Sequence, residues 1–299
     1  MSASMISFSR STIGKNMDNP LKQFLIRTGA TRAYYSFQMR KHQRLGLERG
    51  IYILSFDLDY ERDVLSLPAV LKALSRYGIP ASFACVGKWI EKYPLLHQHI
   101  LANGHEILNH TYSHPDNEEL NPKQFFHALS HEEKKREIAQ FHAVCRERLN
   151  YVPIGFRTPH FGRQHTDDVY ALLKSLGYRY SSSVAANRAL QYGLPYEVGG
   201  IMELPLGCSS LHPRCVFDSW SSRTSPNPNF KTDEEFLTEF SYLLDITEKE
   251  KAFTTHYFDP WHMVKHGLLS RMGKLLKDKD LELMTYRQFL GNKRKKGGM

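Results

Sequence analysis

The sequence is poor in cysteine and contains no long apolar run. Its four cysteines, Cys85, Cys145, Cys208 and Cys215, are scattered and form no C-x-x-C pair, which predicts free, partly buried thiols. No apolar segment approaches the roughly 18 residues that a membrane-spanning helix needs. Internal repeats are absent, and low complexity is confined to the last few residues. These absences argue against a disulfide framework, a membrane-spanning protein and a repeat array.

The composition is that of an ordinary globular protein, with 41% hydrophobic and 24% charged residues among 299. This is enough for one barrel-sized domain or two small ones. The first twenty residues, MSASMISFSRSTIGKNMDNP, lack the continuous apolar core and the cleavage site of a secretory signal. We therefore expect a cytoplasmic protein.

The net charge of +9 is concentrated at the two ends of the chain. Residues 1–46 carry eight Lys or Arg and one acid, and the tail NKRKK adds four positive charges, whereas residues 47–290 carry 28 basic and 30 acidic residues. Basic ends are either solvated tails or binding segments, so an anionic membrane surface or a lipid phosphate is a candidate partner. Nucleic acid is disfavoured, because no motif with interleaved aromatic residues accompanies the charge.

Short apolar runs alternate with segments of helical spacing from residue 50 onward. The runs at 51–57, 81–86, 105–110, 154–156, 178–184, 201–206, 251–258 and 281–286 predict buried strands. Helices are predicted over 67–78, 93–104, 130–149, 166–177, 232–248 and 268–277, with capping boxes at Ser130–Glu133 and Thr232–Glu235. The alternation predicts a parallel α/β fold and, at this length, a barrel.

The chain divides into three predicted parts. A basic extension (1–48), helical over about 21–43, precedes the barrel (49–290), and a basic tail (291–299) follows it. A loop rich in Ser, Pro and Arg is predicted over 207–230. Function in such barrels lies at the C-terminal ends of the strands, and the polar motifs described next all fall there.

The stretch SFDLDY places Asp57 and Asp59 at the end of the first predicted strand. Residues i and i+2 of a strand point to one face, so the two carboxylates converge. They are costly beside a buried strand unless something uses their charge. Three other interpretations are two solvated turn acids, the metal–diphosphate site of a glycosyltransferase, and the D-x-D of haloacid-dehalogenase phosphatases. Glu61 weakens the last, because those phosphatases usually carry Thr or Val there.

His110 and His114 have the spacing H-x-x-x-H, which predicts one side of a helical turn and half of a metal site. Chance pairs at this spacing are expected among fifteen histidines. The metal-site interpretation therefore depends on the combination of this pair with the D-x-D. Two histidines and one aspartate suit a catalytic zinc ion and equally the facial triad of a non-haem iron oxygenase. The second aspartate favours a hydrolase, which needs a base beside the metal.

Two further motifs place charged or titratable side chains at strand ends. GFRTPHFG positions Arg157 where it would keep the base carboxylate ionised and oriented, although it also suits a surface turn. AFTTHYFDPW positions His256 where it would donate a proton to a leaving group, although a buried, hydrogen-bonded histidine is the plainer interpretation.

These residues, in this order, resemble the polysaccharide deacetylase (NodB-homology) family, a carbohydrate esterase type 4-like group. The matching stretches are SFDLD, IPASFACVG, GHEILNHTYSHP, GFRTPHFG, YSSSV and TTH, spread over about residues 50–290, and the second-histidine segment is the most specific. The resemblance implies a distorted (β/α) barrel with fewer than eight regular strands. It also implies Zn²⁺, or another divalent transition metal such as Co²⁺, Mn²⁺ or Ni²⁺.

The resemblance also implies a role for each matched residue. Asp57 would be the general base and Arg157 its partner. Asp59, His110 and His114 would bind the metal. The backbone N–H of His160, after Pro159, would stabilise the oxyanion, and His256 would be the general acid.

The sequence departs from the family pattern in three places. Leu58 separates two aspartates that are usually adjacent, which marks a subgroup. The aspartate and tryptophan that the family carries near YSSSV are missing, and Asp218, Trp220 or Asp259 are candidates to orient His256 in their place. Thr254 replaces a leucine, which would make the acyl pocket smaller and more polar.

The sequence therefore predicts a metal-dependent N-deacetylase of an amino sugar. Its substrate would be a precursor or a lipid-linked saccharide of surface polysaccharide biosynthesis, handled in the cytoplasm or at the inner membrane face. One alternative is a D-x-D glycosyltransferase that binds a nucleotide sugar through manganese and has no role for His114. The other is a catalytically degenerate relative that binds metal or carbohydrate without turnover.

Overall fold

A nine-stranded sheet forms the centre of the protein. The computed structural model describes residues 25–26, 28–224, 227 and 229–295. The strands are β1 (Gly50–Leu58), β2 (Ala81–Cys85), β3 (Glu106–Asn109), β4 (Gly155–Phe156), β5 (Tyr180–Ser181), β6 (Tyr196–Val198), β7 (Ile201–Glu203), β8 (Phe253–Phe258) and β9 (Leu281–Leu283). Their order is β6-β7-β5-β4-β3-β2-β1-β8, and β9 pairs with the start of β1. Only β6 and β7 pair antiparallel within this sheet.

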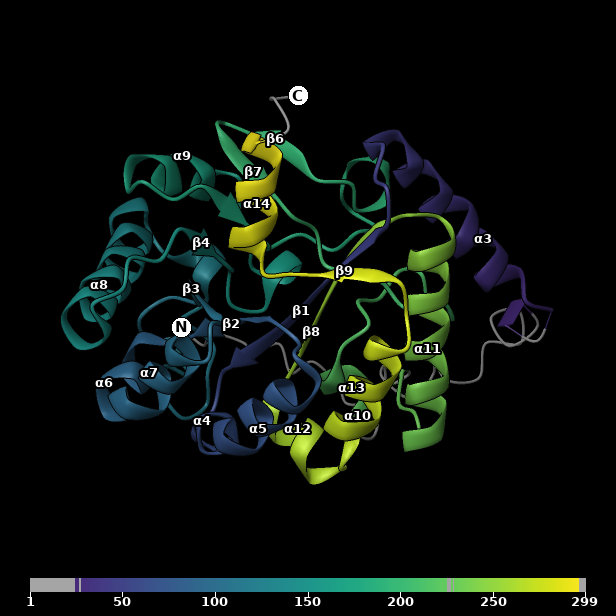
Figure 1. The fold of residues 1–299 in the computed structure, drawn as a ribbon. Helices are drawn as coiled ribbons and strands as arrows, with labels where there is room; N and C mark the ends of the chain where they lie inside the picture. Colours follow the sequence, from purple (N-terminus) through teal and green to yellow (C-terminus); the bar gives the residue numbers. More distant parts are fainter. Residues whose placement is uncertain (1–24, 27, 225–226, 228, 296–299) are drawn as a thin grey trace, which may run out of the picture.

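Helices surround the sheet (Figure 1). They are α3 (Ala30–Arg40), η1 (Lys41–Leu45), α4 (Glu61–Leu65), α5 (Leu67–Tyr77), α6 (Gly87–Lys92), α7 (Pro94–Ala102), η2 (Phe126–Ala128), α8 (His131–Leu149), η3 (Phe161–Arg163), α9 (Asp168–Ser175), η4 (Leu190–Tyr192), α10 (Ser219–Arg223), α11 (Asp233–Lys249), α12 (Pro260–Lys265), α13 (Leu268–Lys277) and α14 (Tyr286–Lys295). A mostly parallel sheet inside a ring of helices is the distorted (β/α) barrel that the sequence predicts. Among the described residues, no helix has the length and apolar character needed to cross a bilayer.

Local signals place the long helices accurately. Ser130 caps α8, and its hydroxyl accepts a hydrogen bond from the Glu133 backbone N–H, while Glu133 reaches back to the Ser130 N–H. Thr232 and Glu235 form the same capping box on α11. Both boxes satisfy backbone donors that the first helical turn leaves without a partner. The predicted starts of these two helices are therefore confirmed.

The two faces of β1 belong to different cores, and this decides which residues reach the site. Every residue of β1 is buried. Ile51 and Ile53 pack against other strands inside the barrel. Tyr52, Leu54 and Phe56 pack outward into the layer between the sheet and the helices. Because successive side chains alternate, Asp57 continues the inner series.

The N-terminal segment packs on the barrel from residue 30 onward. The predicted helix over 21–43 appears in part as α3 and η1, and residues 21–24 and 27 lie outside the described residues. Tyr35 and Met39 of α3 are buried in the main core. The division at 48/49 and the basic tail from 291 stay predictions, with α14 running from Tyr286 to Lys295.

Several short elements escape the sequence analysis. The loop predicted over 207–230 contains α10, and β6 adds a strand that forms a hairpin with β7. The strand predicted over 281–286 ends at Leu283, and α14 begins at Tyr286. The prediction of free thiols is confirmed, because all four cysteines are unpaired.

Candidate metal centre

Asp59, His110 and His114 come together at the C-terminal ends of β1 and β3. One ligand atom from each lies within 4.8 Å of the others. Asp59 Oδ1 is 3.2 Å from His110 Nε2 and 3.3 Å from His114 Nε2. Both histidines are buried, and the Asp59 side chain is 19% exposed. The three residues that the sequence predicts as ligands therefore form one cluster.

The main chain fixes Asp59 from two sides. Its carbonyl oxygen accepts hydrogen bonds from Trp89 Nε1 at 3.0 Å and from Asn117 Nδ2 at 2.8 Å. Asn117 is fully buried and Trp89 is nearly so. These contacts hold the main chain of Asp59 just after the end of β1.

The two histidines lie on a loop and not on a helical turn, so the predicted helix is wrong. β3 ends at Asn109, and Thr111 and His114 have φ angles of 67° and 51°. The left-handed backbone is held by Asn109 Oδ1, which accepts from the Thr111 N–H at 2.7 Å. Thr111 Oγ1 in turn accepts from the His114 N–H at 3.1 Å. A chain reversal thus brings the two imidazoles together, with ring centroids 4.9 Å apart.

The donor atoms fit a cation. His110 Nδ1 donates to the Arg157 carbonyl oxygen at 2.8 Å, because a carbonyl only accepts, and Nε2 therefore presents a lone pair when the ring is neutral. Asp59 Oδ1 and His114 Nε2 are buried and have no hydrogen-bond partner among the described residues. Lone pairs that face one another without a proton are costly in a buried site. A divalent metal would satisfy all three, and a ligand histidine held by a carbonyl is a common supporting arrangement.

Electrostatics favour an ionised Asp59. Burial raises the pKa of this carboxyl, but His114 and His110 outweigh burial and hold the pKa well below its usual range. A carboxylate that stays charged beside two imidazoles is a suitable ligand for a divalent cation.

Asp57 and Arg157 form a buried ion pair beside the cluster. The Arg157 guanidinium contacts Asp57 Oδ1, and both side chains are buried. Asp57 Oδ2 lies 3.9 Å from His110 Nε2. Burial raises the pKa of Asp57, and the charges of Arg157 and His110 oppose that rise. The pair therefore places a carboxylate next to the predicted metal ligands.

Arg157 is itself held by four further hydrogen bonds. Its guanidinium donates to Ser55 Oγ at 3.0 Å, to the Ser182 carbonyl at 3.1 Å and hydroxyl at 3.2 Å, and to the Tyr286 hydroxyl at 2.9 Å. Ser55, Ser182 and Tyr286 are not predicted from the sequence. Only Ser55 carries a signal, since it precedes Asp57 by two residues on the same strand face.

Pro159 and His160 lie where β4 leads into η3. Pro159 is buried, and His160 has a left-handed backbone with a φ of 53°. The His160 ring lies edge-on to His114, with centroids 5.1 Å apart, and its Nε2 is 3.3 Å from the Asp116 carbonyl. Among the hydrogen bonds of the described residues, none uses the His160 backbone N–H as a donor. That N–H is free for an oxyanion, and the oxyanion role stays a prediction.

His256 does not join the cluster, so its prediction as the general acid needs correction. Its Nδ1 lies 3.2 Å from the Tyr52 hydroxyl, on the outer face of the sheet. The ring also packs against Phe217, with centroids 5.5 Å apart. Burial lowers the pKa of His256 to about 3, which keeps the imidazole uncharged at neutral pH. The plainer interpretation, a buried and hydrogen-bonded histidine, is the one that the structure supports.

The candidates for orienting His256 have other partners. Asp259 Oδ2 accepts from Ser219 Oγ at 2.6 Å and pairs with His262 Nδ1 at 3.1 Å. Asp218 caps α10 by accepting from the Ser221 N–H at 2.6 Å. Trp220 is 49% exposed. None of these contacts reaches His256.

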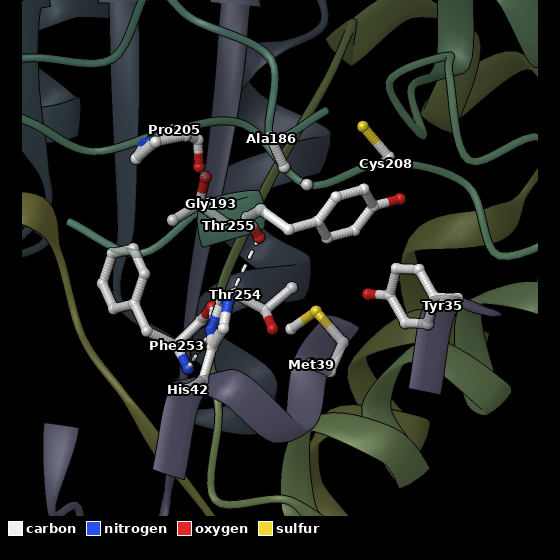
Figure 2. Close-up of a pocket in the computed structure, with 12 residues that line it drawn as sticks. Tyr35, Met39, His42, Ala186, Gly193, Pro205, Cys208, Phe253, Thr254 and Thr255 are labelled. Atoms are coloured by element: carbon white, nitrogen blue, oxygen red, sulfur yellow. Dashed lines mark hydrogen bonds between the residues drawn. The ribbon is translucent and has the colours of Figure 1, made fainter. Parts of the chain in front are cut away.

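The pocket in Figure 2 lies where α3 and η1 pack against β8 and is separate from the metal cluster. Tyr35, Met39 and His42 line it from one side and Thr254 from the other. Thr254 also bonds Thr247, their hydroxyl oxygens 2.9 Å apart. The expectation that Thr254 lines an acyl pocket is therefore wrong, because it faces outward with His256. None of the predicted ligand or base residues lines this pocket.

The fold and the cluster define a distorted (β/α) barrel with a candidate divalent-metal centre at its C-terminal edge. Residues 46–181 match the family model described as polysaccharide deacetylase. This match confirms, over residues 46–181, the resemblance to that family which the sequence predicts.

Two curated relatives are similar to part of the chain. A chitooligosaccharide deacetylase from Sinorhizobium fredii is 41% identical over 78 residues, which cover 26% of this chain and 35% of the relative. A peptidoglycan-N-acetylglucosamine deacetylase from Bacillus cereus is 29% identical over 98 residues, 33% of this chain and 32% of the relative. The chain thus spans about a third of the length of each.

Solved structures show the same fold over most of the chain. A Mycobacterium smegmatis protein assigned to the polysaccharide deacetylases has a TM-score of 0.68 at 15% identity, covering 83% of this chain and 91% of that one. A polysaccharide deacetylase from Bacillus cereus has a TM-score of 0.53 at 15% identity, covering 80% and 92%. At these identities the likeness concerns the fold alone.

Proposed function

We propose that this protein is a metal-dependent N-deacetylase of an amino sugar. The observation that carries the proposal is the buried Asp57–Arg157 pair beside the Asp59, His110 and His114 cluster. A hydrolase needs a metal-binding set and a separate base within reach of the same water, and this arrangement supports the proposal of both. The names of the two curated relatives support an N-acetylated saccharide as the substrate class.

The proposed chemistry follows from the positions of the side chains. A divalent metal held by the cluster would polarise the acyl carbonyl and lower the pKa of a water molecule. Asp57 accepts the proton of that water while Arg157 holds its carboxylate in place. The His160 N–H donates to the acyl oxygen as negative charge develops there. Water adds its oxygen to the acyl carbon, the C–N bond breaks, and the protonated Asp57 returns its proton to the amine.

The geometry disfavours the glycosyltransferase alternative. That alternative has no role for His114, yet His114 Nε2 lies 3.3 Å from Asp59 Oδ1 in a buried position without a hydrogen-bond partner. The degenerate relative is a second candidate, and the outward position of His256 is the observation that favours it. Such a relative would bind metal and release no acetate from any saccharide.

Acetate release is the direct test. The purified full chain would be incubated with chitooligosaccharides and peptidoglycan fragments, before and after chelation, and then with Zn²⁺, Co²⁺, Mn²⁺ or Ni²⁺ restored. We expect activity that is lost with the metal and restored by at least one of these ions. Asp57→Asn should lower kcat by about 100-fold or more at unchanged metal content, the scale of a lost general base. Full activity of Asp57→Asn with normal metal would overturn the assignment of the base.

We propose, more specifically, that the substrate is a precursor or lipid-linked saccharide of surface polysaccharide biosynthesis. The reaction would take place in the cytoplasm, at the inner membrane face. The support for this is the positive charge of residues 1–46. Tyr35 and Met39 are buried, so deletion of the whole segment would remove packed side chains. A deletion of residues 1–24 is the better variant, because it leaves Tyr35 and Met39 in place. The intact chain should co-sediment with phosphatidylglycerol vesicles at low salt, and the deletion should weaken this. Failure of the intact chain to bind would exclude the lipid surface.

A further inference from the structure

The outward position of His256 raises the question of which residue of β8 faces the site. β8 pairs in parallel with β1, and Tyr257 is the register partner of Ser55. Ser55 donates to the His256 carbonyl and accepts from Arg157, so it lies on the inner face. Because side chains alternate along a strand, Tyr257 shares that face and His256 does not.

Tyr257 lies directly against the Asp57–Arg157 pair. The Arg157 guanidinium carbon is 5.6 Å from the centroid of the Tyr257 ring. On its other side the ring meets Phe161 edge-on at 5.4 Å, in the loop that follows His160. The tyrosine thus lies between the base and the segment that would bind the acyl oxygen.

The Tyr257 hydroxyl lacks a hydrogen-bond partner among the described residues. Among the described residues it makes no hydrogen bond, although the residue is only 7% exposed. It is also absent from the fully buried polar atoms that lack a partner, so the oxygen keeps some exposed surface. A buried phenol usually bonds its hydroxyl to a neighbour, as Tyr286 does with Arg157. The open hydroxyl points to a partner that the described residues do not supply.

The Tyr257 hydroxyl is suited to donate a hydrogen bond. Burial raises the pKa of Tyr257 well above its usual range, and the carboxylates of Asp218, Asp259, Asp57 and Asp59 add to the rise. The phenol therefore keeps its proton at neutral pH. A neutral donor beside Asp57 can hydrogen-bond to an oxygen that becomes negative during acyl transfer, and such donors contribute about 10²- to 10³-fold in rate.

We propose that Tyr257 is a further catalytic residue, whose hydroxyl donates a hydrogen bond to the acyl oxygen of the substrate and to the departing acetate. The proposal rests on the proposed deacetylase function and adds a second donor to the His160 N–H. The opposing interpretation is structural, in which the ring only packs between Arg157 and Phe161. The two differ in what happens when the hydroxyl alone is removed.

The experiment compares two tyrosines from opposite faces of the sheet. Tyr257→Phe keeps the ring and removes the hydroxyl. Tyr52→Phe is the matched control, because among the described residues the Tyr52 hydroxyl bonds only to the outward His256. In the zinc-loaded full chain we expect Tyr257→Phe to lower kcat for acetate release by about 100-fold with little change in KM, metal content or Tm. Tyr52→Phe should stay within about threefold of the parent.

A second measurement tests the role of Tyr257 separately from the proposed deacetylase function. The cobalt-loaded chain would be titrated with acetate, and binding followed in the visible absorption of the cobalt ion. Tyr257→Phe should weaken acetate binding by about tenfold, the scale of one lost hydrogen bond of about 1.4 kcal/mol. If the parent releases no acetate from any saccharide, the deacetylase function fails while this titration still decides on Tyr257. Equal acetate affinity in parent and variant, or none in the parent, would overturn the proposal, as would unchanged turnover in Tyr257→Phe.

Discussion

The imidazole of His110 and the main-chain carbonyl of Arg157 are joined by a hydrogen bond of 2.8 Å. Through its side chain the same arginine contacts Asp57. Arg157 therefore contacts a predicted metal ligand through its backbone and the proposed base through its guanidinium. A displacement of Arg157 would disturb both contacts together.

Replacement of Arg157 by lysine should distinguish the effect of its positive charge from the effect of its hydrogen-bond geometry. A lysine keeps the positive charge but cannot bond Asp57, Ser182 and Tyr286 at once, because it lacks the planar fork. We expect kcat to fall by about 10- to 100-fold and the free energy of unfolding to fall by about 2 kcal/mol, the cost of buried hydrogen bonds left unmade. Arg163→Lys, an exposed arginine in η3, is the control and should change neither. Urea unfolding and steady-state kinetics would measure both effects, and a fully active Arg157→Lys would contradict the positioning role.

The cluster should bind one divalent ion per chain. His114→Gln should weaken metal binding by more than the roughly 10–100-fold that follows loss of a ligand's supporting hydrogen bond. His99→Gln, at an exposed position on α7, should retain full metal content. Elemental analysis after dialysis against a defined zinc buffer would compare the two variants. Equal zinc content in both would show that His114 is not a ligand.

Metal removal should also lower stability. A ligand that binds only the folded chain stabilises it by about 2.7 kcal/mol at a hundredfold excess over its Kd. The unpartnered lone pairs of Asp59 and His114 would lose their cation on chelation. We therefore expect a lower Tm for the chelated parent, and a smaller difference for His114→Gln. A Tm that does not respond to metal in the parent would contradict a site preformed in the fold.

The long helices could be predicted from the sequence because their signals are local. Ser130 and Thr232 lie three residues before Glu133 and Glu235, and each box acts within one helical turn. Replacement of Ser130 by alanine should cost about 1 kcal/mol of stability, the usual value of a lost cap, and leave activity unchanged. Thermal unfolding and acetate release would measure both. Lost activity without lost stability would show that α8 has a role at the site.

The sequence predicts the proximity of His110 and His114 correctly but from the wrong backbone conformation. The spacing of His110 and His114 predicts a helical turn, whereas the chain reverses through left-handed residues after β3. Spacing alone cannot separate the two conformations, because both bring residues i and i+4 together. The distinction depends on Asn109, whose side chain bonds the Thr111 N–H and also the Ile138 carbonyl at 2.9 Å. That last contact comes from a distant helix, which local sequence does not reveal.

The error at His256 has a different physical cause. Along β8, Phe253, Thr255 and Tyr257 alternate with Thr254, His256 and Phe258, and both series are buried. A strand buried on both faces lacks the polar–apolar alternation that would indicate which side faces inward. The pairing of Tyr257 with Ser55 shows which of the two series faces the inside of the barrel. Short helices such as α4 and α10, five residues each, are missed because they contain little more than one turn of pattern.

Asp218 should make stability depend on pH. Burial raises its pKa from near 4 to about 7, although the Ser221 N–H and hydroxyl oppose the rise. The folded chain thus holds this proton more tightly than the unfolded chain does. The resulting stabilisation is fully present below about pH 4 and is lost as the pH rises through about 7. Between pH 5 and pH 8 this one group should lower the free energy of unfolding by about 3 kcal/mol.

Asp218→Asn tests this directly, because asparagine keeps an oxygen that can cap α10 and carries no charge. Urea unfolding at pH 5, 6, 7 and 8, at constant metal saturation, should show a flatter pH dependence for the variant. Its stability relative to the parent should be greatest at pH 8, where the parent must bury the charge beside Asp259. Asp278→Asn, at an exposed position, should follow the parent curve. Parallel curves for Asp218→Asn and the parent would mean that Asp218 titrates alike in the folded and unfolded chain, since only a difference between the two states makes stability depend on pH.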